Sequence, residues 1–185
     1  MKEEARRIIA PLEPDLVREL RVGERVLLSG TVLTGRDAAH KRMADLLTAG
    51  TPLPFSIERE VIYYVGPTPA PPGRPIGAAG PTTAYRMDAY APLLIEHGLK
   101  GMIGKGQRSE AVKQAMAKWG AVYFSAIGGI GALISRRVKE ATVLVWEDLG
   151  AEAVRRLVVE DLPLIVATDT LGGDLYISGP AQFRR

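Results

Sequence analysis

Two kinds of apolar pattern alternate along the chain, and this alternation restricts the possible folds more than any other feature of the sequence. Runs rich in leucine and β-branched residues, such as 24–34 (ERVLLSGTVLT) and 60–66 (EVIYYVG), are typical of strands. Residues 36–50 and 108–120 instead repeat their apolar residues with a helical period and end in glycine. Strands that alternate with helices predict an α/β fold.

The second half of the chain continues this pattern with more interruptions. A helix is expected from Pro81 to about His97, because proline is favoured at the first helical position and Gly98 follows. An apolar strand near 163–168 leads to a Gly-Gly pair, which predicts a hairpin into a strand at 175–177. The other expected elements are a strand and turn at 99–106, a strand from 121, a helix at 130–139, a strand at 141–148 and a short helix after Gly150.

A segment rich in proline and glycine, 68–80, interrupts the alternation and is expected to be an extended loop lying over a single domain. Together with the expected terminal hairpin, it argues against a purely parallel sheet. Residues 1–20 are expected to form an N-terminal arm, in which Pro11 and Pro14 prevent a long helix. The domain itself is predicted to cover residues 21–185.

Composition excludes several classes of function. Hydrophobic residues make up 46% and charged residues 24% of the chain, as in ordinary globular proteins. The net charge of +3 is small and its basic residues are scattered, which argues against a nucleic-acid partner. The longest mostly apolar run, 121–134, is too short and glycine-rich to span a membrane. The lack of cysteine excludes disulfides and thiolate-bound clusters held by this chain alone, and it fits a cytoplasmic protein.

The stretch GPTTAYRMD (80–88) is the first candidate for a binding site. A helix capped by Gly80 and begun by Pro81 would place Thr82 in the first turn, where free backbone N–H groups converge. Arg86 would lie one turn further on the same face. A carboxylate or phosphate could bind there. The alternative is a well-capped helix whose arginine pairs with Asp88 or another surface acid.

The stretch SGTVLTGRDAAHKRM (29–43) is the second candidate. It places Arg36 where a strand passes into a helix, a usual position for ligand contacts in α/β proteins. Asp37 and His40, three residues apart, could share a proton or fix an imidazole tautomer. The alternative is a helix N-terminal acid with an ordinary surface histidine. With only two histidines in the chain, a histidine-rich metal site is not expected.

The stretch GMIGKG (101–106) places Lys105 between two glycines at a strand end, where it could reach an anion or simply occupy an exposed turn. The glycines at 128–131 do not match the dinucleotide fingerprint, because position 134 is isoleucine, so a nucleotide-binding enzyme is disfavoured. Arg36, Thr82, Arg86 and Lys105 all lie at element junctions and suit negative oxygen. Three cations in one pocket would repel one another unless a small dicarboxylate compensated them.

At these residues the sequence resembles a known family. The segments that carry the resemblance are SGTVLTGRDAAHKRM (29–43), IYYVGPTPAPPGRPIGAAGPTTAYRMD (62–88), GMIGKG, EDLGAEAVRRL (147–157) and LPLIVATDTLGGDLY (162–176). They are similar, in this order, to the β subunit of class I, iron–sulfur-dependent fumarate hydratases and to the related L-tartrate dehydratase β subunit. The likeness extends over roughly residues 20–177.

The resemblance implies a swivelling β/β/α-type domain that packs against a separate α subunit. In this family the α subunit binds a [4Fe–4S] cluster, whose open iron would act as a Lewis acid on the hydroxyl that leaves as water. The motifs imply that Arg36, Arg86 and Lys105 bind the substrate carboxylates and that Thr82 is the base. Asp37 and His40 occupy positions implied to orient Arg36 or to relay a proton.

The resulting expectation is the β subunit of a hetero-oligomeric hydro-lyase that interconverts fumarate and L-malate and needs its α subunit for activity. A homodimer is the expected state of the chain alone. One alternative keeps the chemistry and changes the substrate to tartrate or methylfumarate. Another, from a different class, is an anion-binding or assembly subunit without catalysis of its own.

Overall fold

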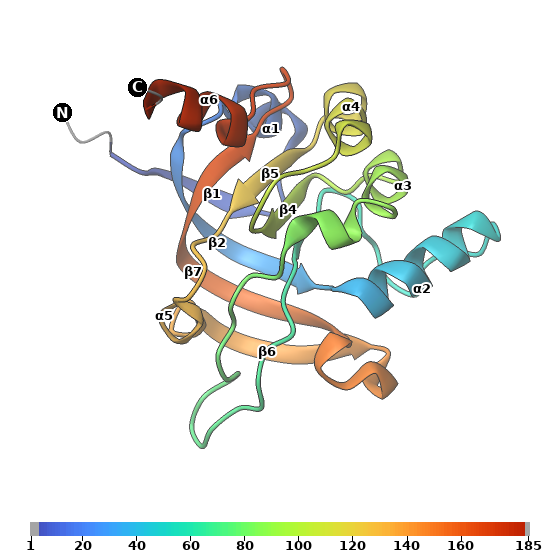
Figure 1. Cartoon of the computed structure of the whole chain (residues 1–185). Helices are drawn as coiled ribbons and strands as arrows, with labels where there is room; N and C mark the ends of the chain where they lie inside the picture. The colour runs from blue at the N-terminus through green and yellow to red at the C-terminus, as the bar shows by residue number, and fades with distance from the viewer. Residues whose placement is uncertain (1–3, 184–185) are drawn as a thin grey trace.

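The structure, a computed structural model that describes residues 4–183, is built on a mixed seven-stranded sheet (Figure 1). Four strands run parallel in the order β2, β3, β4 and β5, and the long strand β7 is antiparallel to both β5 and β2. Because β7 pairs at both ends of this series, five strands close into a ring. Their bounds are β2 Arg25–Thr34, β3 Val61–Tyr63, β4 Gly101–Gly104, β5 Val122–Ser125 and β7 Val154–Thr168.

Two further strands extend the ring. Strand β1 (Arg6–Ala10) pairs in parallel with β2, and β6 (Val138–Val145) pairs antiparallel with β7. The segment expected to be an N-terminal arm therefore contributes β1 to the sheet and the short helix α1 (Pro14–Glu19), whose Val17 is buried. Within residues 4–183, the expectation of an α/β domain with a mixed sheet is confirmed.

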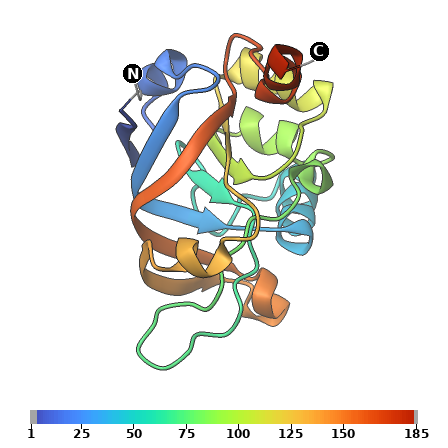
Figure 2. The same cartoon turned by 60° about the vertical axis from the view of Figure 1, so that its left-hand side comes forward.

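The parallel strands β3, β4 and β5 are apolar because both of their faces are buried, whereas β1 and β6 at the edges of the sheet carry charged, exposed residues. Val61 and Tyr63 of β3 point into one core cluster, which fills the ring, whereas Ile62 and Tyr64 point into a second cluster between the sheet and the helices. This alternation follows from the two-residue period of a strand. The helices α2 (Asp37–Thr48), α3 (Ala91–Glu96) and α4 (Glu110–Trp119) cover that second cluster on one side of the sheet (Figures 1 and 2).

The predicted helix over 81–97 is wrong in its first half. Thr82 and Thr83 are extended, a 3₁₀ turn η1 covers Ala84–Met87, and α3 begins only at Ala91 with Pro92 in its first turn. The amide of Thr82 donates to the carbonyl of Tyr64, and that of Ala84 donates to Lys105. Pairing with neighbouring strand ends therefore outweighs the local helix-start signal at Pro81.

The prediction for the region after Gly150 is also wrong. A 3₁₀ segment η2 covers Glu147–Glu152, and β7 begins at Val154, where a helix was expected. β7 is held on both edges by β2 and β6, which overrides a sequence compatible with a helix. The expected helix over 130–139 is reduced to α5 (Gly131–Ser135), because β6 begins at Val138.

The predicted hairpin into 175–177 is replaced by helix α6 (Leu175–Phe183). Asp169 accepts hydrogen bonds from the amides of Leu171 and Gly173 and so turns the chain after β7. Asp174 then accepts from the amide of Tyr176, as a helix N-cap does. The carboxylate of Asp174 therefore caps a helix at the position where the Gly-Gly pair predicted a strand.

The proline-rich segment 68–80 forms an extended loop that projects from the lower end of the ring in Figures 1 and 2. Thr68 closes its base by hydrogen bonds with the backbone of Gly77 and Ala78. None of the helices within residues 4–183 combines the length and the apolar character that a membrane span requires.

Candidate functional site

The candidate residues gather at one edge of the sheet. The parallel strands β2, β3, β4 and β5 end at the same edge, and α/β proteins bind ligands beyond these carboxyl ends. Arg36 follows β2, Gly66 follows β3, and Lys105 follows β4 directly. Residues 82–86 lie beside them, because Thr83 forms a parallel bridge with Lys105.

One carboxylate joins the two arginines that were predicted to bind substrate. Asp37 accepts a hydrogen bond of 2.9 Å from Nε of Arg86 and lies 3.8 Å from Nε of Arg36. The side chains of Arg86 and Asp37 are 44% and 32% exposed, so this ion pair is open to solvent. Arg86 uses only Nε for it, and its two terminal nitrogens have no hydrogen-bond partner among residues 4–183. A planar fork thus remains free for a ligand carboxylate.

Arg36 is less exposed than Arg86, at 25% against 44%, and it contacts two carboxylates at longer distances. Its Nη2 lies 3.3 Å from a carboxylate oxygen of Glu152, and the other oxygen of Glu152 accepts from the amide of Ala38. Gly66 lies against the guanidinium, since a Cβ there would be 3.0 Å from Nη1. The lack of a side chain at Gly66 therefore lets Arg36 extend along the sheet edge. Glu152, on η2, was not among the predicted site residues.

Thr82 and Lys105 lie on adjacent extended segments. The amide of Lys105 donates to the carbonyl of Thr82, and the carbonyl of Lys105 accepts from Ala84. The ammonium of Lys105 is exposed and forms no ion pair within residues 4–183. The predicted anion site at a helix N-terminus is wrong, because the amide of Thr82 is already bonded to Tyr64. The positive groups near Thr82 are side chains, and no helix dipole acts there.

The five charged groups at this edge are Arg36, Arg86, Lys105, Asp37 and Glu152, with one net positive charge. The predicted three cations are therefore brought to one edge, but two carboxylates partly compensate them. This compensation lets the arginines lie together without a ligand.

His40 does not pair with Asp37. Its Nδ1 lies 2.9 Å from the carbonyl oxygen of Arg36, so Nδ1 carries the proton and donates it. The ring is fully buried against the edge of Tyr64, with a centroid distance of 5.1 Å. Burial lowers the pKa of His40 to about 4, with a further contribution from Arg108. The imidazole is therefore neutral at physiological pH, and its visible task is to hold the backbone of Arg36.

A buried polar cluster behind the site was not foreseen. The side chain of Arg108 is 0% exposed; Nε donates to Asp88 at 2.7 Å and Nη1 donates to the hydroxyl of Tyr64 at 3.0 Å. The guanidinium also lies 5.1 Å from the ring centroid of Tyr123. In the sequence, Arg108 reads as an ordinary residue before a helix. Nothing there signals that Asp88, twenty positions earlier, is its partner.

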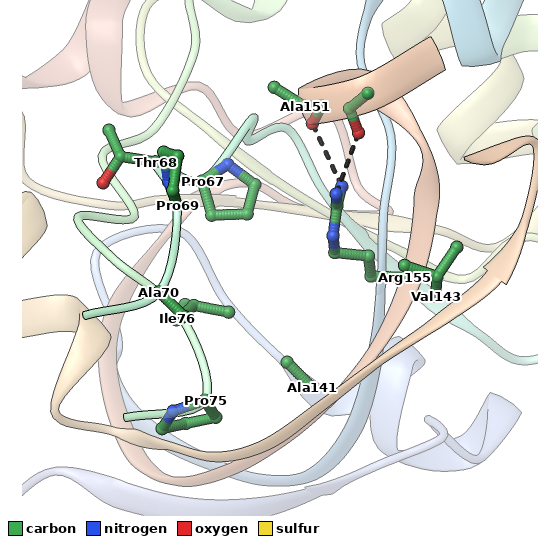
Figure 3. Close-up of a pocket in the computed structure, with 11 residues that line it drawn as sticks. Pro67, Thr68, Pro69, Ala70, Pro75, Ile76, Ala141, Val143, Ala151 and Arg155 are labelled. Carbon is green, nitrogen blue, oxygen red and sulfur yellow. Dashed lines mark hydrogen bonds between the residues drawn. The ribbon is translucent and has the colours of Figure 1, made fainter. Parts of the chain in front are cut away.

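A separate cavity of about 430 Å³ lies beside the loop that follows β3 (Figure 3). It is lined by residues of the 67–76 loop, of β6 and of η2, and by Arg155 of β7. Arg155 is its cationic residue, and its guanidinium donates to the carbonyls of Gly150, Ala151 and Ala153, two of which Figure 3 marks with dashed lines. Because both terminal nitrogens of Arg155 are bonded to backbone carbonyls, this cavity offers a dicarboxylate fewer free donors than the edge that carries Arg86 and Lys105.

The chain does not fit the role of a cluster or metal holder. It contains no cysteine, and residues 4–183 include no group of three or more histidine and carboxylate side chains placed to hold an ion. An iron–sulfur cluster needs thiolate ligands. The residues of this chain therefore do not fit a thiolate-bound cluster.

The fold and this edge define a class: an α/β domain that presents arginine and lysine side chains at the carboxyl ends of parallel strands. The family follows from comparison with known proteins. The family model described as "Fumarase C-terminus" matches residues 3–179, and the chain belongs to this family.

The curated relatives support the same assignment. The chain is 40% identical over 168 residues to "Fumarate hydratase 1, mitochondrial" of Leishmania major, covering 88% of this chain and 31% of the relative. It is 41% identical over 157 residues to "Fumarate hydratase class I, anaerobic" of Escherichia coli K12, covering 84% of this chain and 29% of the relative. The chain thus spans less than a third of the length of these enzymes.

A third relative has nearly the same length as this chain. It is the "Putative L(+)-tartrate dehydratase subunit beta" of Methanocaldococcus jannaschii, 34% identical over 166 residues. The match covers 86% of this chain and 85% of the relative.

Proposed function

We propose that this chain is the β subunit of a heteromeric hydro-lyase that interconverts fumarate and L-malate together with an α subunit. The observation that carries the proposal is the contact of one carboxylate, Asp37, with both Arg36 and Arg86, at the edge where Lys105 also ends. The two fumarate hydratases compared above are more than three times as long as the aligned region. The remaining part of such an enzyme is expected in the α subunit, which would hold the [4Fe–4S] cluster that this cysteine-free chain cannot.

This chain's first task is to bind a dicarboxylate. Within residues 4–183, the terminal nitrogens of Arg86 and the ammonium of Lys105 have no partner, so Arg86 suits a two-point contact with one carboxylate and Lys105 suits the other. Arg36, held by Glu152 and Asp37, would add a fixed third cation. Asp37 then acts as an orienting residue for both guanidinium groups. His40 supports this orientation by donating a hydrogen bond to the backbone carbonyl of Arg36.

The second task is to accept a proton. Removal of a proton beside a carboxylate moves negative charge onto that carboxylate, so cations aimed at it stabilise the transition state more than the ground state. Thr82, half-buried and bonded through its backbone to Lys105, is proposed as the base. The nearby cations, rather than a helix dipole, would lower the energy of its alkoxide.

Tartrate is the second candidate substrate. The relative whose length nearly equals that of this chain is named as a tartrate dehydratase subunit, and the same cationic edge would bind either dicarboxylate. Contacts that distinguish the two substrates would then come from the partner chain.

The test is to purify the chain together with the cluster-bearing partner from the same cell. The complex should hydrate fumarate, and neither chain alone should do so. Preferred turnover of tartrate would select the second candidate. Binding of dicarboxylates without turnover of either would overturn the hydro-lyase proposal and leave a non-catalytic anion-binding subunit.

Thr82→Val and Thr82→Ser in this complex test the base. Removing a general base typically lowers the rate by about 10²–10⁴-fold. Thr82→Val should therefore lower kcat much more than it changes KM, whereas Thr82→Ser, which keeps the hydroxyl, should retain most of the rate. A change confined to KM would make Thr82 a binding residue.

A further inference from the structure

Lys105 lies in a turn whose peptide groups form hydrogen bonds with several neighbouring segments. Its amide donates to Thr82, and its carbonyl accepts from Ala84 at 2.8 Å. The carbonyl of Gly106 accepts from the hydroxyl of Tyr123 at 2.9 Å. Gly106 has a φ of +84°, which glycine adopts readily and an L side chain rarely does, so the turn requires glycine at this position.

The remaining contact to this turn comes from the last helix of the chain. The amide of Gly106 donates to the hydroxyl of Tyr176 on α6 at 2.9 Å. That amide and the carbonyl of Lys105 belong to one peptide plane, so Ala84 holds one end of the plane and Tyr176 holds the other. The amide of Lys105 is bonded as well, to Thr82, so the peptide planes on both sides of its Cα are held and together set the direction of the Cα–Cβ bond.

Helix α6 is anchored well enough to act in this way. Asp174, whose side chain is only 5% exposed, pairs with Lys113 of α4 at 2.9 Å and also accepts from the amide of Tyr176. The hydroxyl of Tyr176 lies 3.0 Å from Oγ of Ser125, at the end of β5. The tyrosine hydroxyl therefore connects α6, β5 and the Lys105 turn.

We propose that Tyr176 is a positioning residue that directs the ammonium of Lys105 toward the substrate carboxylate through the amide of Gly106. The inference rests on the proposed function, in which Lys105 binds a dicarboxylate. Tyr176 itself does not touch the substrate. Its loss lets the peptide plane rotate and spreads the lysine over several directions, which weakens binding of a doubly charged ligand and leaves the proton-accepting group in place.

The experiment is a double-variant cycle in the complex with the cluster-bearing partner. Tyr176→Phe, Lys105→Gln and their combination are compared with the wild type by KM and kcat for fumarate and L-malate. A hydrogen bond of this kind is worth roughly a 3- to 10-fold change, so Tyr176→Phe should raise KM by about that factor with kcat nearly unchanged. In the Lys105→Gln background the same substitution should change KM less than about twofold, because the side chain it directs is gone.

Ser178→Ala is the matched control. Ser178 is also on α6, and its hydroxyl bonds only the carbonyl of Asp174 within the described residues. Its KM should equal that of the wild type. Melting temperatures of all variants separate loss of folding from loss of positioning. If Tyr176→Phe folds poorly, Ser125→Ala removes the other partner of the tyrosine hydroxyl and should raise KM in the same direction.

The outcomes distinguish this inference from the proposed function. If Lys105→Gln leaves KM unchanged, the assignment of Lys105 to substrate binding fails. If Lys105→Gln raises KM but Tyr176→Phe has no effect, or has the same effect in both backgrounds, Tyr176 is a structural contact and the inference is overturned.

Discussion

Two arginine–aspartate pairs with nearly equal geometry stand in opposite surroundings. Nε of Arg86 lies 2.9 Å from Asp37, and Nε of Arg108 lies 2.7 Å from Asp88. The first pair is 44% and 32% exposed, whereas the second is 0% and 11% exposed. Contacts of similar length therefore lie in an exposed candidate site in one case and in a buried cluster in the other.

The difference shows how the site is divided between binding and support. The open pair stays hydrated, so a carboxylate ligand can replace or join Asp37 at little cost. The closed pair has no water to replace a lost partner, and Arg108 also bonds Tyr64, whose ring packs against His40. The buried cluster of Arg108, Asp88 and Tyr64 thus packs behind the exposed cations and supports them.

The largest expected effect follows from breaking the buried pair. Arg108→Ala leaves the carboxylate of Asp88 without its cation and should lower the free energy of unfolding by about 3–5 kcal/mol. Urea denaturation of the chain alone measures this value. Arg108→Ala combined with Asp88→Ala should be less destabilised than the sum of the two single variants. If Arg108→Ala lowered the free energy of unfolding by less than about 1 kcal/mol, the buried pair would contribute no more than an exposed one, and the two pairs would not differ.

The next effect is a dependence of stability on pH, carried by His40. Its pKa is about 4 in the folded protein, against an ordinary value of 6.5 for histidine. Between pH 4 and pH 6.5 the imidazole of His40 is protonated in the unfolded chain but not in the folded one. The free energy of unfolding therefore decreases as the pH is lowered from 6.5 toward 4, by at most about 3 kcal/mol. Stability is fully retained above pH 6.5.

His40→Gln should remove this part of the acid sensitivity, measured as the slope of unfolding free energy against pH. His97→Gln is the control, because His97 is exposed at the end of α3. Equal slopes for wild type and His40→Gln would show that the buried imidazole does not titrate differently on folding.

The next effect is one on activity, and it is expected at the exposed pair of Arg86 and Asp37. Arg86→Lys keeps the charge and loses the planar fork, so kcat/KM in the reconstituted complex should fall by about 10- to 100-fold. The melting temperature should change little, because the pair is exposed. Wild-type kcat/KM for this variant would remove Arg86 from the substrate site.

The smallest effect completes the comparison. Arg86→Ala should lower the free energy of unfolding by less than about 1 kcal/mol, because exposed ion pairs contribute little. That corresponds to a shift in Tm of at most about 2–4 °C for a domain of this size. The shift should decrease further in high salt, whereas the loss caused by Arg108→Ala should persist. A salt-insensitive loss of several kcal/mol at Arg86 would contradict the open character of this pair.

Much of the fold could be predicted from local pattern. The runs that became β2 and α2, and the amphipathic helix α4, were recognisable from their periodicity and terminal glycines. The errors fell where partners distant in sequence decide the conformation. Thr82 is extended because Tyr64 and Lys105 bond the segment around it, and β7 is a strand because β2 and β6 flank it.

The candidate site was likewise only partly visible in the sequence. The motifs indicated Arg36, Arg86 and Lys105, since cations beside strand ends and glycines have a recognisable pattern. Glu152 and Tyr176 could not be inferred, because each contacts its neighbour across more than sixty positions of the chain. The expected Asp37–His40 pair failed for a different reason: the imidazole turned inward, where the carbonyl of Arg36 was available.

The sequence by itself determined the α/β class, the lack of thiolate ligands and the family, because these depend on composition, periodicity and residue identity at motif positions. Only the tertiary structure decided that Asp37 joins two arginines, that Arg108 and His40 are buried, and that α6 reaches the Lys105 turn. Burial and long-range hydrogen bonds arise from how the ring of strands closes, and closure is a property of the whole chain rather than of any local segment.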